Sequence, residues 1–128
     1  MTAPNPSPTP TPRTPHVVCQ TSDLAPGQRL IIEVGGRSVG VFNIAGQFFA
    51  LHNRCPHAGG ELCRGPLTKS PWAPIDPNIS AGPTGTLIIC MSHGWEFEVE
   101  SGRCLTDPNY RARSFPVTVA DGQVTVHV

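Results

Sequence analysis

The chain has 128 residues, with nine basic and nine acidic side chains and a formal net charge of zero. This length suits one compact domain and is short for two. Because the charge is balanced and no run of Lys or Arg occurs, phosphate-backbone binding is excluded as the main activity, and we expect no nucleic-acid partner.

The apolar runs and the cysteines set the expected compartment. The longest apolar run, Leu87 to Met91, is far below the roughly 18 residues that span a bilayer, and the N-terminus lacks an apolar signal core. Five cysteines in no regular spacing suit a reducing compartment with thiols used for metal, and a secreted disulfide scaffold is the alternative. We therefore predict a cytoplasmic protein without a membrane partner.

Proline dominates the start of the chain. Six prolines fall within residues 1–15, separated mainly by Thr, Ser and Asn. Such a segment cannot bury a core, so we expect residues 1–15 to form a disordered, solubilising tail outside the domain. A ligand for a proline-recognition domain is the alternative role.

Short β-type runs follow the tail. Four of them precede the central region, at residues 16–21, 29–34, 38–44 and 47–51, and three follow it, at 95–99, 114–120 and 124–128. Gly35-Gly36, Ala45-Gly46 and Asp121-Gly122 stand where hairpin turns belong. No window shows a sustained apolar period of 3.6, so we predict an all-β domain of antiparallel strands with little or no helix.

Two short segments each place one Cys near one His. Cys55 and His57 follow a Cys-x-His order, and Cys90 and His93 follow a Cys-x-x-His order. Structural zinc sites usually pair Cys with Cys and His with His along the chain. The mixed order suits two iron atoms, because each loop would then supply one ligand to each iron. Two such loops would enclose a [2Fe-2S] cluster, with both Cys on the inner iron and both His on the outer one.

With these motifs, the chain from about His16 to Val128 resembles the Rieske iron-sulfur family, specifically its small ferredoxin-like members. The resemblance implies a Rieske domain over 16–128: an antiparallel β-sandwich or barrel base carrying a cluster-binding subdomain at about 52–106. It also implies one Rieske-type [2Fe-2S] cluster per chain, with a ligand set of Cys55, His57, Cys90 and His93.

The function implied by the resemblance is one-electron transfer from a reductase to a terminal oxygenase, as in ring-hydroxylating dioxygenase systems. The chain would then be an electron-transfer component rather than a self-contained enzyme. An oxygenase would need a mononuclear iron held by two His and a carboxylate, and the remaining His16, His52 and His127 are scattered. Two alternatives stay open: a small accessory subunit of a nitrite reductase and, from a different class, a structural Cys2His2 zinc module.

A proline-containing stretch separates the two motifs. We expect residues 66–86 to be an irregular insertion, longer than the connector usual in the resembled family, with Trp72 packed back onto the domain. Cys19, Cys63 and Cys104 are expected to be buried structural residues, although a disulfide between Cys63 and Cys104 stays open.

Residues beside the ligands predict a low reduction potential. High-potential respiratory members of the resembled family carry a Ser after the His-Gly pair, a Tyr two residues later and a disulfide between the two loops. This chain has Trp95 and Phe97 at the hydroxyl positions, and Gly60 and Ser92 at the disulfide positions. We therefore expect a midpoint in the lower part of the range of roughly −150 to +300 mV for Rieske centres.

Two further loop features are expected to support the cluster. Gly59, Gly60 and Gly94 lack a Cβ, so their backbone N–H groups are expected to approach the sulfides. The segment Asp107 to Tyr110 resembles the proline-containing loop that covers the cluster in the family, and covering it would exclude water.

Overall fold

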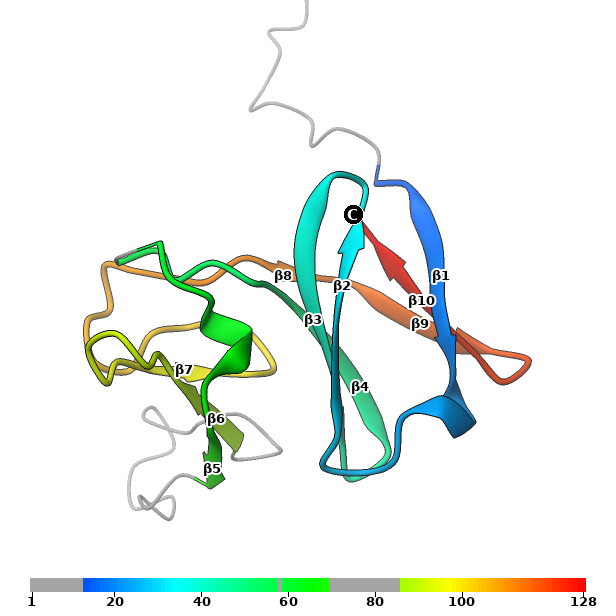
Figure 1. Cartoon of the computed structure of the whole chain (residues 1–128), viewed down its shortest axis with the longest axis horizontal. Coiled ribbons are helices and arrows are strands. Elements are labelled where there is room, and N and C mark those ends of the chain that lie inside the picture. The colour runs from blue at the N-terminus through cyan, green and yellow to red at the C-terminus, as the bar shows by residue number, and fades with distance from the viewer. Residues whose placement is uncertain (1–12, 58, 70–85) are drawn as a thin grey trace, which may run out of the picture.

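The structure is a computed structural model in which residues 13–57, 59–69 and 86–128 are described (Figure 1). The predictions for residues 1–12, and those for residues 70–85 with Trp72, lie outside the described residues. Within the described residues the regular secondary structure is almost entirely β-strand, and the two helical segments are single 3-10 turns, η1 (Thr21–Asp23) and η2 (Leu62–Arg64). The predicted all-β, antiparallel fold is confirmed.

The first sheet joins the two ends of the domain. It contains β1 (Pro15–Gln20), β10 (Gln123–His127) and β9 (Val117–Ala120), in the order β1-β10-β9. Backbone hydrogen bonds of 2.9 and 3.0 Å between Thr14 and Val128 extend the pairing by one residue at each end. The ordered sheet therefore begins slightly before the expected boundary at His16.

The second sheet packs against the first. It contains β2 (Arg29–Val34), β3 (Arg37–Ile44), β4 (Gln47–His52) and β8 (Ser114–Phe115), in that order and all antiparallel. Gly35-Gly36, Ala45-Gly46 and Asp121-Gly122 each connect two strands, with positive φ at both residues. This is the backbone that two-residue hairpins need, so the three predicted turns are confirmed.

Strand β3 is buried on both faces and links two hydrophobic cores. Val39 and Val41 point into the core between the first two sheets, together with Phe115 and Val124. On the opposite face, Phe42 belongs to a second core shared with the cluster-binding unit. Because alternate residues of a strand point to opposite faces, one strand fixes both cores relative to each other.

The third sheet forms the smaller unit, seen on the left of Figure 1. It contains β5 (Leu67–Lys69), β6 (Thr86–Ile89) and β7 (Glu96–Glu98), in that order and antiparallel. The expectation that residues 66–86 are irregular throughout is wrong at both ends, because β5 and the first residue of β6 are paired strands. The strand-favouring residues at these ends are Leu67, Thr68 and Thr86, and the prolines of this stretch led to the prediction of irregular structure.

In the described part of the chain, no helix has the length and apolarity needed to cross a membrane.

Candidate metal centre

The two predicted ligand loops lie at one end of the smaller unit. Cys55 comes shortly after β4, in the connection that leads to η2, and Cys90 comes directly after β6, in the connection to β7. Both Cys side chains belong to the same hydrophobic core and are 0% and 1% exposed. Strands from different sheets therefore bring the two loops to a common point.

The two loops share one hydrogen-bonding pattern. In the first, the Cys55 N–H donates to the Gly60 carbonyl at 2.8 Å and the Gly59 N–H donates to the Cys55 carbonyl at 2.7 Å. In the second, the Cys90 N–H donates to the Trp95 carbonyl and the Gly94 N–H to the Cys90 carbonyl, both at 2.8 Å. Gly59 and Gly94 hold equivalent places, with φ of 77° and 73°.

This pattern corrects one expectation from the sequence. The N–H groups of Gly59 and Gly94 close the loops by binding Cys carbonyls instead of pointing at sulfides. These positions need Gly for a different reason, namely a left-handed backbone that other residues adopt only with strain.

The loops also bring the two predicted His residues together. The His57 and His93 rings meet edge to face, with centroids 4.6 Å apart and an interplanar angle of 79°. His57 is half-buried, whereas His93 is exposed. All four predicted residues therefore gather at one place, with the thiols inside and the imidazoles toward the surface.

Cys90 lies in a group of hydrogen-bond donors. Burial raises the pKa of its thiol, but hydrogen bonds from the Ser92 backbone, the Cys55 side chain, the Ser92 hydroxyl and the His93 backbone lower it below the ordinary value. Donors that favour the charged form of a thiol favour the form that binds metal.

His57 carries a buried polar atom without a partner. Its Nδ1 has no hydrogen-bond partner among the described residues. Buried ring nitrogens are almost always satisfied, so an unpaired one in this position calls for an explanation. A bond from Nδ1 to a metal would supply the missing partner, and this atom together with the two buried thiols fits the donor set of a Rieske cluster.

The arrangement differs from a site for one metal ion. Within residues 13–57, 59–69 and 86–128, no three His, Cys, Asp or Glu side chains are grouped to hold a single ion. A Cys2His2 zinc site would need such a group, whereas each iron of a Rieske cluster takes only two protein ligands.

Two aromatic side chains complete the site, and the sequence did not reveal their contacts. Trp95, expected to pack beneath the loop, is stacked on His57 with centroids 3.8 Å apart and an angle of 15°. Tyr110 meets both rings edge to face, at 6.0 Å from His57 and 5.1 Å from Trp95. The loop from Asp107 to Tyr110 thus reaches the site, as its resemblance to a covering loop implied.

Asn53 holds the base of the first ligand loop and was missed in the sequence. Its Oδ1 accepts the Cys63 N–H at 2.8 Å, and its Nδ2 donates to the Ser38 hydroxyl at 3.1 Å and to Glu61 Oε1 at 3.3 Å. The side chain is only 6% exposed. One amide therefore ties both ends of the loop to strand β3, and no sequence motif signals this role.

The other cysteines form no disulfide. All five lie within the described residues and none forms a disulfide, so the pairing of Cys63 with Cys104 does not occur. Cys63 is fully buried, and burial raises its pKa to about 12. Cys104 is buried in the same core, and Cys19 is half-buried on β1. These positions fit the expected structural roles.

The remaining His residues contact the two base sheets. His16 lies on β1, His52 meets Phe115 edge to face at 6.3 Å, and His127 Nε2 is 2.9 Å from the Thr118 hydroxyl. Each therefore has an environment in the base and not in the ligand loops.

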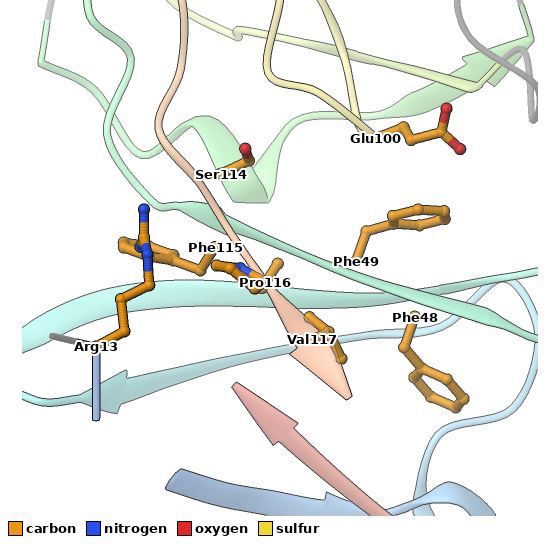
Figure 2. Close-up of a pocket in the computed structure, with 9 residues that line it drawn as sticks. Arg13, Phe48, Phe49, Glu100, Ser114, Phe115, Pro116 and Val117 are labelled. Atoms are coloured by element: carbon orange, nitrogen blue, oxygen red, sulfur yellow. The ribbon is translucent and has the colours of Figure 1, made fainter. Parts of the chain in front are cut away.

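A cavity of about 420 Å³ lies between β4, β8, β9 and the Glu100 turn (Figure 2). Phe48 and Phe49 point to opposite sides of β4, and Glu100 approaches from the smaller unit. None of the four predicted ligands lines it. The cavity is thus separate from the candidate centre.

The chain belongs to the Rieske [2Fe-2S] domain family, which matches residues 14–120. It is therefore a Rieske protein with a [2Fe-2S] cluster, and its function is electron transfer with other redox proteins.

Its relatives include ferredoxin components of oxygenase systems. The ferredoxin component of the alkene monooxygenase system of Xanthobacter autotrophicus is 30% identical over 109 residues, which cover 85% of this chain and 77% of the relative. The ferredoxin component of biphenyl 2,3-dioxygenase from Rhodococcus jostii is 42% identical over 91 residues, covering 71% and 70%. The chain is thus a ferredoxin-type member of the family.

Solved structures agree with this placement. A chain from the complex of reduced oxygenase and oxidized ferredoxin in carbazole 1,9a-dioxygenase is 28% identical, with a TM-score of 0.67 and 88% and 92% coverage. A putative NADH-dependent nitrite reductase small subunit from Mycobacterium tuberculosis has a TM-score of 0.73 at 21% identity, covering 91% and 96%. The second similarity concerns the fold alone.

Proposed function

We propose that Cys55 and Cys90 bind the inner iron of the cluster, that His57 and His93 bind the outer iron, and that the chain passes one electron from a reductase to a terminal oxygenase. The observation that supports this most is the buried His57 Nδ1, which has no partner among the described residues, on a ring that meets a second imidazole, while the Cys thiol of each ligand loop is buried.

The cluster supplies a centre that takes up and releases one electron. The chain's own residues adapt this centre to its task. Donors around Cys90 favour the thiolate, and burial of both thiols in the core shields the sulfur side of the site from water. The exposed His93 places one ligand at the surface, where another protein can approach.

We also propose a midpoint in the lower part of the Rieske range. Trp95 and Phe97 carry no hydroxyl group, which supports this placement. The Ser92 hydroxyl does bind Cys90, so one hydroxyl donor reaches a ligand sulfur after all. A redox titration with a midpoint in the upper half of the range would contradict the proposal.

A cytoplasmic location is proposed as well. It is supported by five cysteines that form no disulfide, as is usual in a reducing compartment.

Analysis of the purified chain for iron and acid-labile sulfide, with an absorption spectrum, tests the ligand set. A red-brown protein is expected, with visible bands that Cys55→Ser and His93→Ala abolish and Cys63→Ser leaves intact. Cys63 is the matched control because it is a buried cysteine in the same core. Bands that persist in either of the first two variants would remove that residue from the ligand set.

A second experiment tests the partners. Reduction by a ferredoxin reductase, followed by reoxidation by a terminal oxygenase, is expected to cycle the visible bands. The nitrite reductase alternative predicts instead that the chain purifies with a large reductase subunit.

A further inference from the structure

Four arginines gather on one part of the surface, around His52 and Phe115. Two of them, Arg13 and Arg113, place their guanidinium carbons 5.8 and 5.5 Å from the centre of the Phe115 ring, and Figure 2 shows Arg13 beside that ring. The His52 ring meets the same Phe115 ring edge to face, at 6.3 Å. Two segments far apart in the sequence therefore bring positive charge to one place.

The other two arginines extend this group toward the first ligand loop. Burial lowers the pKa of His52 most, and three nearby positive charges lower it further, those of Arg37, Arg113 and Arg54. The Arg54 side chain also approaches the loop, because its Nη2 is 3.7 Å from the position that a Cβ at Gly59 would occupy. We call Arg13, Arg37, Arg54 and Arg113 the basic patch, and it adjoins the first ligand loop.

The chain itself does not neutralise the basic patch. Three of its members are exposed, and Arg37 is half-buried. In residues 13–57, 59–69 and 86–128 the ion pairs are Arg64 with Glu61 and Arg103 with Glu98, so no carboxylate there pairs with the patch. The whole chain has as many acidic as basic side chains, so the patch is a local excess of charge. Such an excess suits a partner surface of the opposite sign.

The composition of the patch favours carboxylates as the partner groups. All its members are arginines, whose planar guanidinium groups can bind a carboxylate through two parallel hydrogen bonds. Proteins that bind a phosphate backbone make roughly six to ten such contacts, more than this patch offers. Stable binding to an anionic membrane needs a second anchor, such as an amphipathic helix, and the helical segments of the described residues are single 3-10 turns.

We propose that the basic patch binds a carboxylate-rich face of a protein with which this chain exchanges electrons. The redox nature of the partner rests on the proposed function. Because the patch adjoins the first ligand loop, a partner bound there lies beside the cluster-binding end of the chain. Exposed ion pairs are individually weak, so the complex is short-lived, which suits a carrier that serves a reductase and an oxygenase in turn.

The test uses the cluster-loaded full chain and a fluorescein-labelled oligoglutamate peptide, with binding followed by fluorescence anisotropy. Binding is expected at low salt and is expected to weaken as salt is added, because exposed charges are screened. Arg113→Gln and Arg37→Gln are each expected to weaken binding roughly two- to fivefold. Arg113→Lys keeps the charge and is expected to restore part of the loss. Unchanged binding in both glutamine variants would overturn the proposal.

Gln123→Glu is the matched control, because it makes the same change in net charge as Arg113→Gln. Gln123 is exposed and begins β10, whereas Thr14 pairs with Val128 beyond the other end of this strand, next to the basic patch. The control is expected to leave binding unchanged. Adding Gln123→Lys to Arg113→Gln restores the net charge but not the patch, so binding should stay weak. Equal weakening by the control, or recovery in the double variant, would show that only net charge matters and would overturn the proposal.

Two further probes separate the classes of partner. A double-stranded DNA oligonucleotide and vesicles containing phosphatidylserine are expected to bind more weakly than the peptide at the same salt. Tighter binding of either one, lost in Arg113→Gln, would overturn the proposal in favour of a phosphate-bearing partner. Visible bands without peptide binding would refute this inference and leave the proposed function standing. An unaltered chain without iron, sulfide and visible bands would refute the proposed function.

Discussion

At the scale of single residues, the site depends on a few polar atoms around buried sulfur. Cys90 and Cys63 are both buried in one core, yet the pKa of Cys90 is lowered and that of Cys63 is raised to about 12. At Cys63 desolvation by burial is the largest effect on the pKa and outweighs a backbone hydrogen bond from Gly40, whereas at Cys90 the hydrogen bonds from Ser92 and its neighbours outweigh burial. Local polarity therefore separates the ligand from the structural cysteine.

Ser92→Ala removes a hydroxyl that donates to Cys90. Hydrogen bonds to ligand sulfur stabilise the reduced cluster, so the midpoint is expected to fall by about 40 mV, which corresponds to about 1 kcal/mol for one electron. A redox titration followed by visible absorption measures the change. Ser114→Ala, in β8, is the control, and an unchanged midpoint in Ser92→Ala would show that this hydroxyl does not tune the cluster.

The buried Cys63 thiol predicts a pH dependence of stability. Burial raises its pKa to about 12 in the folded chain, whereas an unfolded Cys ionises near pH 8.5. Above about pH 9 only the unfolded chain loses the proton, so the free energy of unfolding is expected to fall with rising pH, by up to about 1.4 kcal/mol per unit. Urea unfolding between pH 8 and 10 measures the slope, and Cys63→Ala should reduce it. An identical slope in this variant would contradict the assignment.

At the scale of elements, the two ligand loops are nearly equivalent units that face each other. Each follows a strand, and each closes through a glycine with positive φ. The loops differ in what lies against them. Asn53 ties the first loop to β3, and Trp95 and Tyr110 from later segments also contact His57 of this loop. Trp95 also closes the second loop through its carbonyl, so the asymmetry comes both from this loop and from the neighbours Asn53 and Tyr110.

The facing loops predict that a disulfide can be introduced. A Cβ at position 60 would lie 2.9 Å from the Ser92 hydroxyl oxygen, which is close enough for bonded sulfurs. The double variant Gly60→Cys, Ser92→Cys is expected to form a bond under oxidising conditions and to stabilise the chain by roughly 2–4 kcal/mol. Thiol titration and thermal unfolding with and without reductant measure this. Gly60→Cys alone is the control, and no loss of thiols in the double variant would show that the loops are not so placed.

At the scale of the whole molecule, β3 is the element on which the base and the cluster-binding unit both depend. Its two faces belong to two different cores, and Gly40 within it lies directly against Cys63. The 3-10 turn η2, which follows the first ligand loop, therefore packs onto the middle of the base, and its position depends on the absence of a side chain at residue 40.

Gly40→Ala tests this packing. The added Cβ would lie 2.5 Å from the Cys63 Sγ, so Cys63 or the strand must shift, and the free energy of unfolding is expected to fall by roughly 1–3 kcal/mol. Urea unfolding measures the change. Adding Cys63→Gly removes the atoms that collide and should restore part of the loss; no recovery would mean that the collision is not the cause.

Much of this protein was predictable from the sequence because the relevant signals are local. The three two-residue turns followed from glycines that permit positive φ, and the strands followed from alternating β-type residues. The pairing of Cys with His in each loop also indicated the family, because ligand type and spacing are properties of a short segment. Strand β5 was not predicted, because it forms by pairing with β6, which lies beyond residues 70–85 in the chain.

The sequence by itself determined the kind of cofactor and the all-β architecture, since both depend on residues close together in the chain. The tertiary structure alone decided how the site is surrounded. Only folding places Trp95 and Tyr110 against His57, Asn53 between Ser38 and Cys63, and Gly40 against Cys63. These contacts are between residues far apart in the sequence, so local propensities do not predict them. They arise because close packing in the core leaves each side chain only a few neighbours.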